Sequence, residues 1–169
     1  YSVNSTDDQY ILWNNYYDYQ FTNADKVDFF IVATDRQKEV LAAQFAKYTQ
    51  HSPAIYTIPV GSLESLPQKD SRKPFSLITA SRLATEKHID WLIRAVVEAK
   101  KELSALSFDI YGKGGEEEKL RSLIEELGAT DYIQLKGHMD LTAIYKDYEV
   151  YLSASTSEGF GLTLMEAIG

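Results

Sequence analysis

Two glutamates near the carboxyl end of the chain, Glu158 and Glu166, stand eight positions apart and enclose a segment with two glycines. An apolar run at residues 150–152 and a loop of small residues precede them, which predicts a strand, a turn and the start of a helix. Parallel α/β sheets bind ligands at this position, where the carboxyl end of a strand meets the amino end of the next helix. Each carboxylate is therefore a candidate for accepting hydrogen bonds from the diol of a ribose or hexose. Taken alone, the spacing also fits a capped surface helix with two solvated acids.

Cations, glycines and a histidine directly follow the other apolar runs of this region: Arg82, Lys87, Gly112, Gly114 and His138. A diphosphate is bound by cations and by backbone N–H groups that glycine leaves accessible. Each feature is common by itself, because paired surface cations are usually solvated and glycines are frequent in turns. Their succession, each behind its own strand, predicts a site for a nucleotide that carries a sugar. The glycines form neither a dinucleotide-binding fingerprint nor a P-loop.

A regular alternation of strands and helices positions these residues at one edge of a sheet. Strands are predicted at 75–80, 107–111, 132–135 and 150–153, and helices at 89–103, 116–127 and 141–145, with one more that ends the chain. Four strand–helix units in about 95 residues predict an α/β fold with a parallel, doubly wound, Rossmann-like sheet and right-handed crossovers. In such a sheet the loops that follow the strands all lie at the carboxyl edge.

The preceding part of the chain has a simpler pattern. A buried strand is predicted at 28–33, a helix from there to about Tyr48, and a second strand at 55–60. Thr34 and Gln37 have the spacing of a capping box at the start of the helix.

Residues 61–74 contain glycine, serine, proline and mixed charge without periodicity, and are predicted to be a linker. The linker divides the chain into residues 1–60 and residues 75–169. Residues 1–28 are dense in aromatic residues, most of them tyrosine, and either a short strand or a helix fits parts of them. Aromatic side chains at this density usually pack against another element, and less often form a platform for a sugar.

The composition excludes several classes of protein. A net charge of −8 argues against nucleic acid as the main partner, since a phosphate backbone requires clustered lysine and arginine. The chain has no cysteine, which excludes disulfides and thiolate metal sites. No apolar run reaches the roughly 18 residues of a transmembrane helix. The chain begins at Tyr1 rather than at a methionine, and we expect it to be a piece of a longer protein.

Four motifs on the predicted loops resemble the carboxyl-terminal half of a retaining GT-B glycosyltransferase of family 4: SRLATEK at 81–87, YGKG at 111–114, LKGH at 135–138 and SEGFGLTLMEA at 157–167. The resemblance implies a GT-B fold. In it, residues 75–169 would be the nucleotide-sugar donor-binding domain, incomplete at its carboxyl end, and residues 1–60 would end the acceptor-side domain. One departure is visible, because the family often has glycine directly after the E-K pair, where this chain has His88.

The resemblance also implies a role for each candidate residue. Arg82 and Lys87 would bind the donor diphosphate and stabilise charge on the leaving group, and Glu158 would lie beside the donor hexose. The remaining candidates would bind the donor nucleotide-sugar: Glu166 the ribose, His138 and its loop the base, and Gly161, Leu162 and Thr163 the hexose and phosphate through backbone N–H groups. Gly112 is also a candidate for binding the donor nucleotide-sugar. No metal and no cofactor beyond the donor sugar is implied, and the transfer would retain configuration by attack on the face that the phosphate leaves. Glu158 as a covalent nucleophile is the less favoured alternative.

The runs WNNYY at 13–17 and DKVDFFIVATDRQ at 25–37 resemble the catalytic subunits of streptococcal and staphylococcal O-GlcNAc transferases, which start glycan chains on serine-rich adhesins. This implies UDP-GlcNAc as donor, serine or threonine of such an adhesin as acceptor, and a homologous glycosyltransferase subunit as partner. It also implies a cytoplasmic location, with peripheral membrane association as an option, and an isolated piece without activity. A nucleotide-sugar epimerase on the same fold and a non-catalytic partner subunit are the alternatives.

Overall fold

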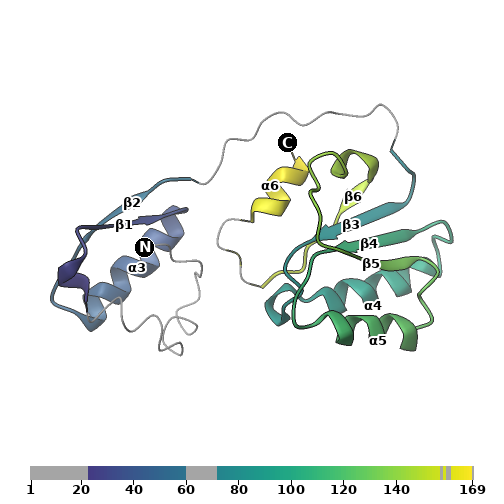
Figure 1. Cartoon of the computed structure of the whole chain (residues 1–169), viewed down its shortest axis with the longest axis horizontal. Coiled ribbons are helices and arrows are strands. Elements are labelled where there is room, and N and C mark those ends of the chain that lie inside the picture. Colours follow the sequence, from purple (N-terminus) through teal and green to yellow (C-terminus); the bar gives the residue numbers. More distant parts are fainter. Residues whose placement is uncertain (1–22, 60–71, 157, 159–160, 169) are drawn as a thin grey trace. The chain divides into compact units, whose positions relative to one another are not determined.

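The computed structural model of the chain describes residues 23–59, 72–156, 158 and 161–168. The open segment 1–28 and the predicted linker 61–74 lie largely outside these residues. The chain forms two compact units, one built from Tyr1–Ser62 with Ser157–Gly161 and the other from Leu63–Thr156 with Leu162–Gly169 (Figure 1). No helix in the described part of the chain is long and apolar enough to cross a membrane.

The first unit is a strand–helix–strand arrangement: η1 (Ala24–Lys26), β1 (Phe29–Val32), α3 (Asp35–Tyr48) and β2 (Ala54–Thr57). The strands are parallel, and α3 covers one of their faces because Phe30 and Val32 of β1 alternate inward. The predicted capping box is confirmed, since Thr34 Oγ1 accepts from the Gln37 backbone and the Gln37 side chain accepts from the Thr34 backbone. The second strand ends at Thr57, earlier than predicted.

The second unit contains the predicted parallel sheet: β3 (Ser76–Ala80), η2 (Thr85–Lys87), α4 (Ile89–Lys100), β4 (Ser107–Tyr111), α5 (Glu117–Glu126), β5 (Ile133–Gly137), η3 (Tyr145–Asp147), β6 (Val150–Tyr151) and α6 (Leu162–Ile168). All four strands run parallel in the order β5-β4-β3-β6.

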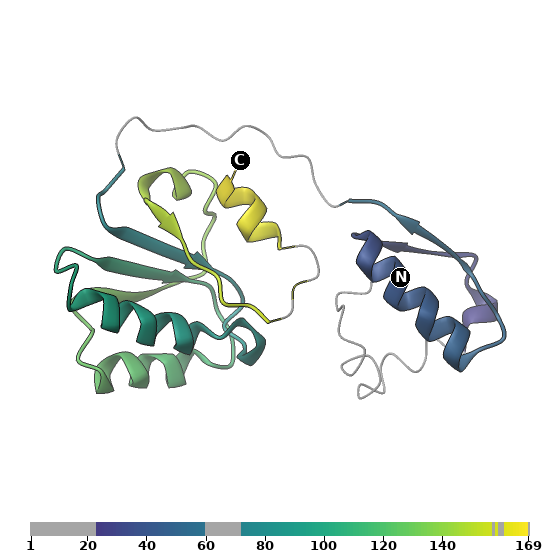
Figure 2. The ribbon, with the colours of Figure 1, turned by 180° about the vertical axis from the view of Figure 1, so that it is seen from behind.

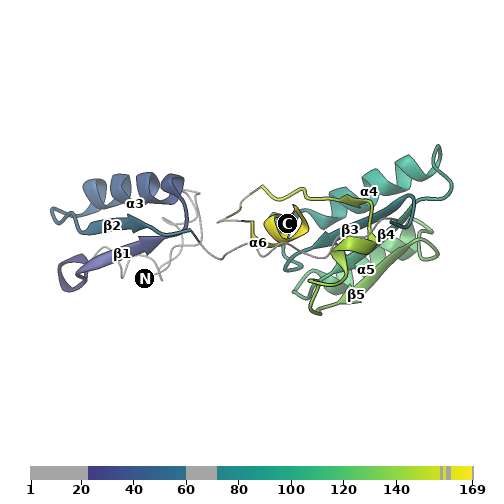
Figure 3. The same cartoon turned by 90° about the horizontal axis from the view of Figure 1, so that it is seen from above.

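Helices lie on both faces of this sheet, as predicted. On one face α4 and α5 lie side by side (Figure 2), and apolar residues at helical spacing, such as Ile93 and Leu120, pack on Phe108 and Ile110 of β4. On the other face, Ile78, Ala80 and Tyr111 form a smaller cluster that Tyr145 of η3 shares and against which Ala167 packs. Ala167 belongs to α6, which lies beside the four-stranded sheet (Figure 3). Side chains on opposite faces of β4 therefore belong to two different apolar layers, Phe108 and Ile110 to one and Tyr111 to the other.

The strand order creates a switch point between β3 and β6. The chain starts at β3, adds β4 and β5 on one side, and returns to the other side of β3 with β6. Ligands of open α/β sheets bind outside the carboxyl ends of the strands at such a point.

The predicted helix at 141–145 is wrong. The structure has a turn there, and only the 3₁₀ helix η3 follows, at Tyr145–Asp147. The Asp140 carboxylate accepts hydrogen bonds from the backbone N–H and the hydroxyl of Thr142, at 3.0 and 2.7 Å. This local pairing offers the backbone an alternative to a helical turn. The same two bonds, the backbone one first, lower the pKa of Asp140.

Candidate functional site

A hollow of about 590 Å³ lies at the carboxyl edge of the four-stranded sheet, and residues that follow each of its strands line it. We call it the carboxyl-edge hollow. It brings together six of the predicted site residues: Arg82, Gly112, His138, Leu162, Thr163 and Glu166. Ser81, Tyr111, Lys113 and residues 139–142 complete the lining together with Ala80. The loops after β3, β4 and β5, which the sequence pattern assigned to one edge, thus meet residues of α6 at one cavity.

Three predicted residues are outside this lining. Lys87 is half-buried at the end of η2, five positions after Arg82 on the same loop. Gly161 stands directly before α6 with a φ of 74°, a backbone conformation that glycine adopts without strain. Glu158 is exposed and belongs to the first unit.

Arg82 is paired with a neighbour of its own loop. Its Nη2 lies 2.6 Å from Glu86 Oε1, and the arginine side chain is 71% exposed. Partial burial acts to raise the pKa of Glu86, but the hydrogen bonds from its backbone and from Arg82 outweigh it, so this pKa lies below its usual value. An exposed pair of this kind contributes little stability. The guanidinium can therefore exchange the carboxylate for a phosphate at small cost.

Gly112 acts here through close packing. A Cβ on Gly112 would lie 1.8 Å from the Ser81 carbonyl oxygen, and one on Gly114 would lie 2.2 Å from that of Leu83. The Gly112 N–H donates to the Gly137 carbonyl at 2.8 Å, so it already has an acceptor within the sheet edge. The glycine turn after β4 thus brings its backbone against the loop that carries Arg82.

Two tyrosines that the sequence reasoning missed hold the residues of α6. The Tyr145 hydroxyl donates to Glu166 Oε2 at 3.3 Å. The Tyr151 hydroxyl donates to the Ala80 carbonyl at 3.0 Å, so the Thr163 hydroxyl must donate to Tyr151 across their 3.0 Å contact. Burial, followed by the charge of Glu166, raises the pKa of Tyr145, which therefore stays a donor. Tyrosines next to predicted strands are too common for sequence alone to have assigned them this role.

His138 is exposed in the loop after β5, where Gly137, with a φ of 75°, turns the chain toward the hollow. Among the described residues, no group of three or more histidine, aspartate or glutamate side chains is placed to hold a metal ion.

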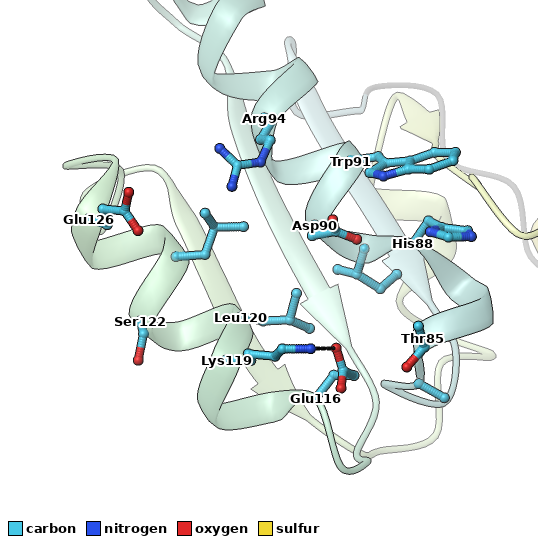
Figure 4. Close-up of a pocket in the computed structure, with 13 residues that line it drawn as sticks. Thr85, His88, Asp90, Trp91, Arg94, Glu116, Lys119, Leu120, Ser122 and Glu126 are labelled. Carbon is cyan, nitrogen blue, oxygen red and sulfur yellow. Dashed lines mark hydrogen bonds and ion pairs between the residues drawn. The ribbon is translucent and has the colours of Figure 1, made fainter.

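A second hollow, of about 580 Å³, lies between α4 and α5 on the face away from α6 (Figure 4). Its charged residues have both signs, and one pair, Lys119 and Glu116, is joined at 2.8 Å (Figure 4). None of the predicted site residues lines it. Of these two hollows, the carboxyl-edge hollow is the one that predicted site residues line.

The family model "Glycosyl transferases group 1" matches residues 64–169. The "UDP-N-acetylglucosamine--peptide N-acetylglucosaminyltransferase GtfA subunit" of Streptococcus pneumoniae is 73% identical over the whole chain, and that of Streptococcus gordonii is 67% identical. The chain spans 34% of the length of each of these relatives.

Solved structures are similar as well. The pneumococcal O-GlcNAc transferase GtfA, crystallised in complex with UDP and GlcNAc, is 68% identical, with a TM-score of 0.89 over 99% of this chain and 35% of that one. A structure of the GtfA/B complex is 68% identical, with a TM-score of 0.74 over 92% of this chain and 31% of that one.

Proposed function

Because the chain belongs to the glycosyl transferases group 1 family, we propose that it is part of an enzyme that transfers N-acetylglucosamine from UDP-N-acetylglucosamine to a peptide. Its parallel α/β fold is that of GT-B glycosyltransferases, as the sequence predicts. The observation that carries the proposal is the carboxyl-edge hollow, which brings together Arg82, Leu162 and Thr163 of α6, and Glu166. A relative that is 68% identical binds UDP and GlcNAc in its crystal structure.

The donor would be held by residues of three loops and α6. We assign the diphosphate to Arg82 and Lys87, and the ribose to Glu166, whose carboxylate Tyr145 orients. The loop of His138 would contact the base. The hexose and phosphate would meet backbone N–H groups at Gly161, Leu162 and Thr163, and Gly112 would shape the phosphate side by close packing.

The proposed reaction is a retaining transfer without a metal ion, of the type found in family 4. As the bond from the anomeric carbon to the phosphate breaks, negative charge develops on the leaving diphosphate, and the preorganised cations of Arg82 and Lys87 stabilise it. The leaving phosphate accepts the proton of the acceptor hydroxyl, which attacks on the same face. Glu158 would stabilise the positive charge that develops on the hexose, and no covalent intermediate is required.

The names of the relatives support a peptide as acceptor and a second subunit as partner. Both relatives described above are named as subunits that act on a peptide, and one solved structure is a GtfA/B complex. We propose serine or threonine residues of a serine-rich adhesin as acceptor, which the resemblance of residues 13–17 and 25–37 implies, and a homologous glycosyltransferase subunit as partner. The enzyme would work in the cytoplasm, at the membrane surface or free of it, with no cofactor other than the donor. Residues 1–60 would belong to the acceptor side, 61–74 to the interdomain linker and 75–169 to the donor side.

The test is transfer from UDP-GlcNAc by the protein at the full length of its relatives. Arg82→Ala and Lys87→Ala should each lower kcat by roughly two to three decades, since a preorganised charge on a leaving group is commonly worth ~3–4 kcal/mol. Arg94→Ala, an exposed arginine of α4 at the other hollow, is the matched control and should leave kcat unchanged. Normal transfer by both site variants would refute the proposal.

A further inference from the structure

His88 has a backbone conformation that its residue type rarely adopts. It links η2 to α4 with φ 46° and ψ 44°, in the left-handed region. A residue with a Cβ costs roughly 1–2 kcal/mol in this conformation. Such strain persists only where the surroundings hold it, and it is often found where a side chain has to be aimed.

Two contacts fix the His88 ring. It stacks on the Trp91 ring, one turn into α4, with centroids 3.9 Å apart and planes 18° apart (Figure 4). Its Nε2 lies 3.2 Å from Thr156 Oγ1. Thr156 is 68 positions away in the chain, in the loop that follows β6.

Thr156 is bound to the η2 loop by its backbone as well. Its N–H donates to the Glu86 carbonyl at 3.1 Å, and its hydroxyl donates to the same oxygen at 3.4 Å. The contact with His88 Nε2 adds the ring to this pair, and the tautomer of His88 decides which of the two groups donates. His88, Thr156 and the Glu86 carbonyl therefore form one set, which we call the loop link.

The loop link joins the two loops on either side of the switch point. β6 is two residues long and pairs with β3 at two register positions, so the strands alone hold these loops weakly. The side chain of Glu86 in turn contacts Arg82 at 2.6 Å. On the other side, the chain continues from Thr156 to Glu158 after one intervening residue.

We propose that His88 is a positioning residue. Its ring, fixed on Trp91, would hold the loop of Arg82 and Lys87 in register with the loop that leads to Glu158. This inference rests on the proposed function, because the two loops are assigned there to the diphosphate and the hexose of one donor. UDP alone does not need this register, since it lacks the hexose and since Tyr145 and Tyr151 anchor α6 independently.

The experiment compares variants of the protein at the full length of its relatives. Thr156→Val removes the hydroxyl at nearly constant shape, and His88→Asn removes the ring but keeps a residue that tolerates the left-handed region. We expect each to lower kcat with UDP-GlcNAc about 5- to 10-fold, with the Kd for UDP changed less than about 2-fold. Thr156→Ser keeps the hydroxyl and should therefore retain most of kcat. The double variant should have a kcat no lower than that of the more impaired single variant, because both substitutions break the same loop link.

The matched control is Thr85→Val, which changes a threonine of the same η2 loop that faces the hollow between α4 and α5. It should leave kcat unchanged. The proposal is overturned if Thr156→Val and His88→Asn transfer normally while Arg82→Ala does not, or if their effects add. It is also overturned if kcat, UDP affinity and Tm all fall together, which would indicate a purely structural role. If Arg82→Ala and Lys87→Ala also transfer normally, the proposed function itself fails.

Discussion

The close packing at Gly112 allows a prediction whose size follows from the geometry. Gly112→Ala would place a Cβ 1.8 Å from the Ser81 carbonyl oxygen, whereas real Cβ atoms essentially never approach below 3.0 Å. The loops after β3 and β4 would have to separate by more than about 1 Å, since the obstacle is backbone and cannot rotate away. The glycine also has a φ of 137°, which alanine rarely adopts.

The cost has two parts. The strained φ accounts for about 1–3 kcal/mol. Separation of the loops would also weaken two hydrogen bonds, from Ser81 N–H to Tyr111 and from Leu83 N–H to Lys113, at about 1 kcal/mol each. We therefore expect Gly112→Ala to lower the free energy of unfolding by about 3–5 kcal/mol, a large part of a typical domain's stability. Because Arg82 lies between the two displaced residues of its loop, the affinity for UDP should fall as well.

Gly115→Ala in the same turn is the matched control. A Cβ at Gly115 meets nothing within 4 Å, and its φ is not positive. Its unfolding free energy should change by less than about 1 kcal/mol, in the direction of greater stability if the chain is only stiffened. Urea unfolding at constant m-value measures both variants, and UDP titration measures the site. If Gly112→Ala is as stable as Gly115→Ala, the loops are not packed as described and the reasoning is refuted.

Three further predictions concern the full-length protein and the chain alone. Glu166→Gln should mainly raise the KM for the donor, by about one to two decades, because it loses a charged hydrogen bond of ~1.5–3 kcal/mol. Glu158→Gln should mainly lower kcat. If steady-state kinetics show the reverse pattern, the two residues exchange roles. Tyr145→Phe should raise the KM for the donor by about 2- to 10-fold, and it should have no effect in a protein that already carries Glu166→Ala. Tyr148→Phe is the control and should leave this KM unchanged, because the Tyr148 hydroxyl contacts Asp109 and Tyr111 instead. The 169-residue chain alone should transfer no sugar in an assay with UDP-GlcNAc and acceptor peptide, and measurable turnover would show that it holds a complete site.

Local patterns predicted the elements well where the interactions that form them are local. The capping box of Thr34 and Gln37 spans three positions, and the strand at Ser107–Tyr111 was found at its observed bounds. The prediction of a helix at 141–145 was wrong because a local interaction competes with the helix there. There a single side chain, Asp140, bonds the backbone two residues on, and hydrophobic spacing does not report such competition.

The roles of individual site residues were less accessible to sequence. The pattern placed Gly112 at the phosphates as a source of free N–H groups, whereas this N–H already donates to Gly137. It also left out Tyr145 and Tyr151, because each acts on a residue of α6 that is 21 or 12 positions away. A hydroxyl partner at that distance leaves no periodic signal.

The sequence by itself determined the succession of strands and helices, and with it the edge at which Arg82, His138 and Glu166 had to lie, because the chain leaves every parallel strand at the same edge. Only the tertiary structure decided the strand order β5-β4-β3-β6, which makes the loops after β3 and β6 neighbours. The contact between His88 and Thr156 depends on that order. Pairing between strands is a choice among edges of similar hydrophobicity, and it depends on the packing of the whole unit, which no short stretch of sequence records.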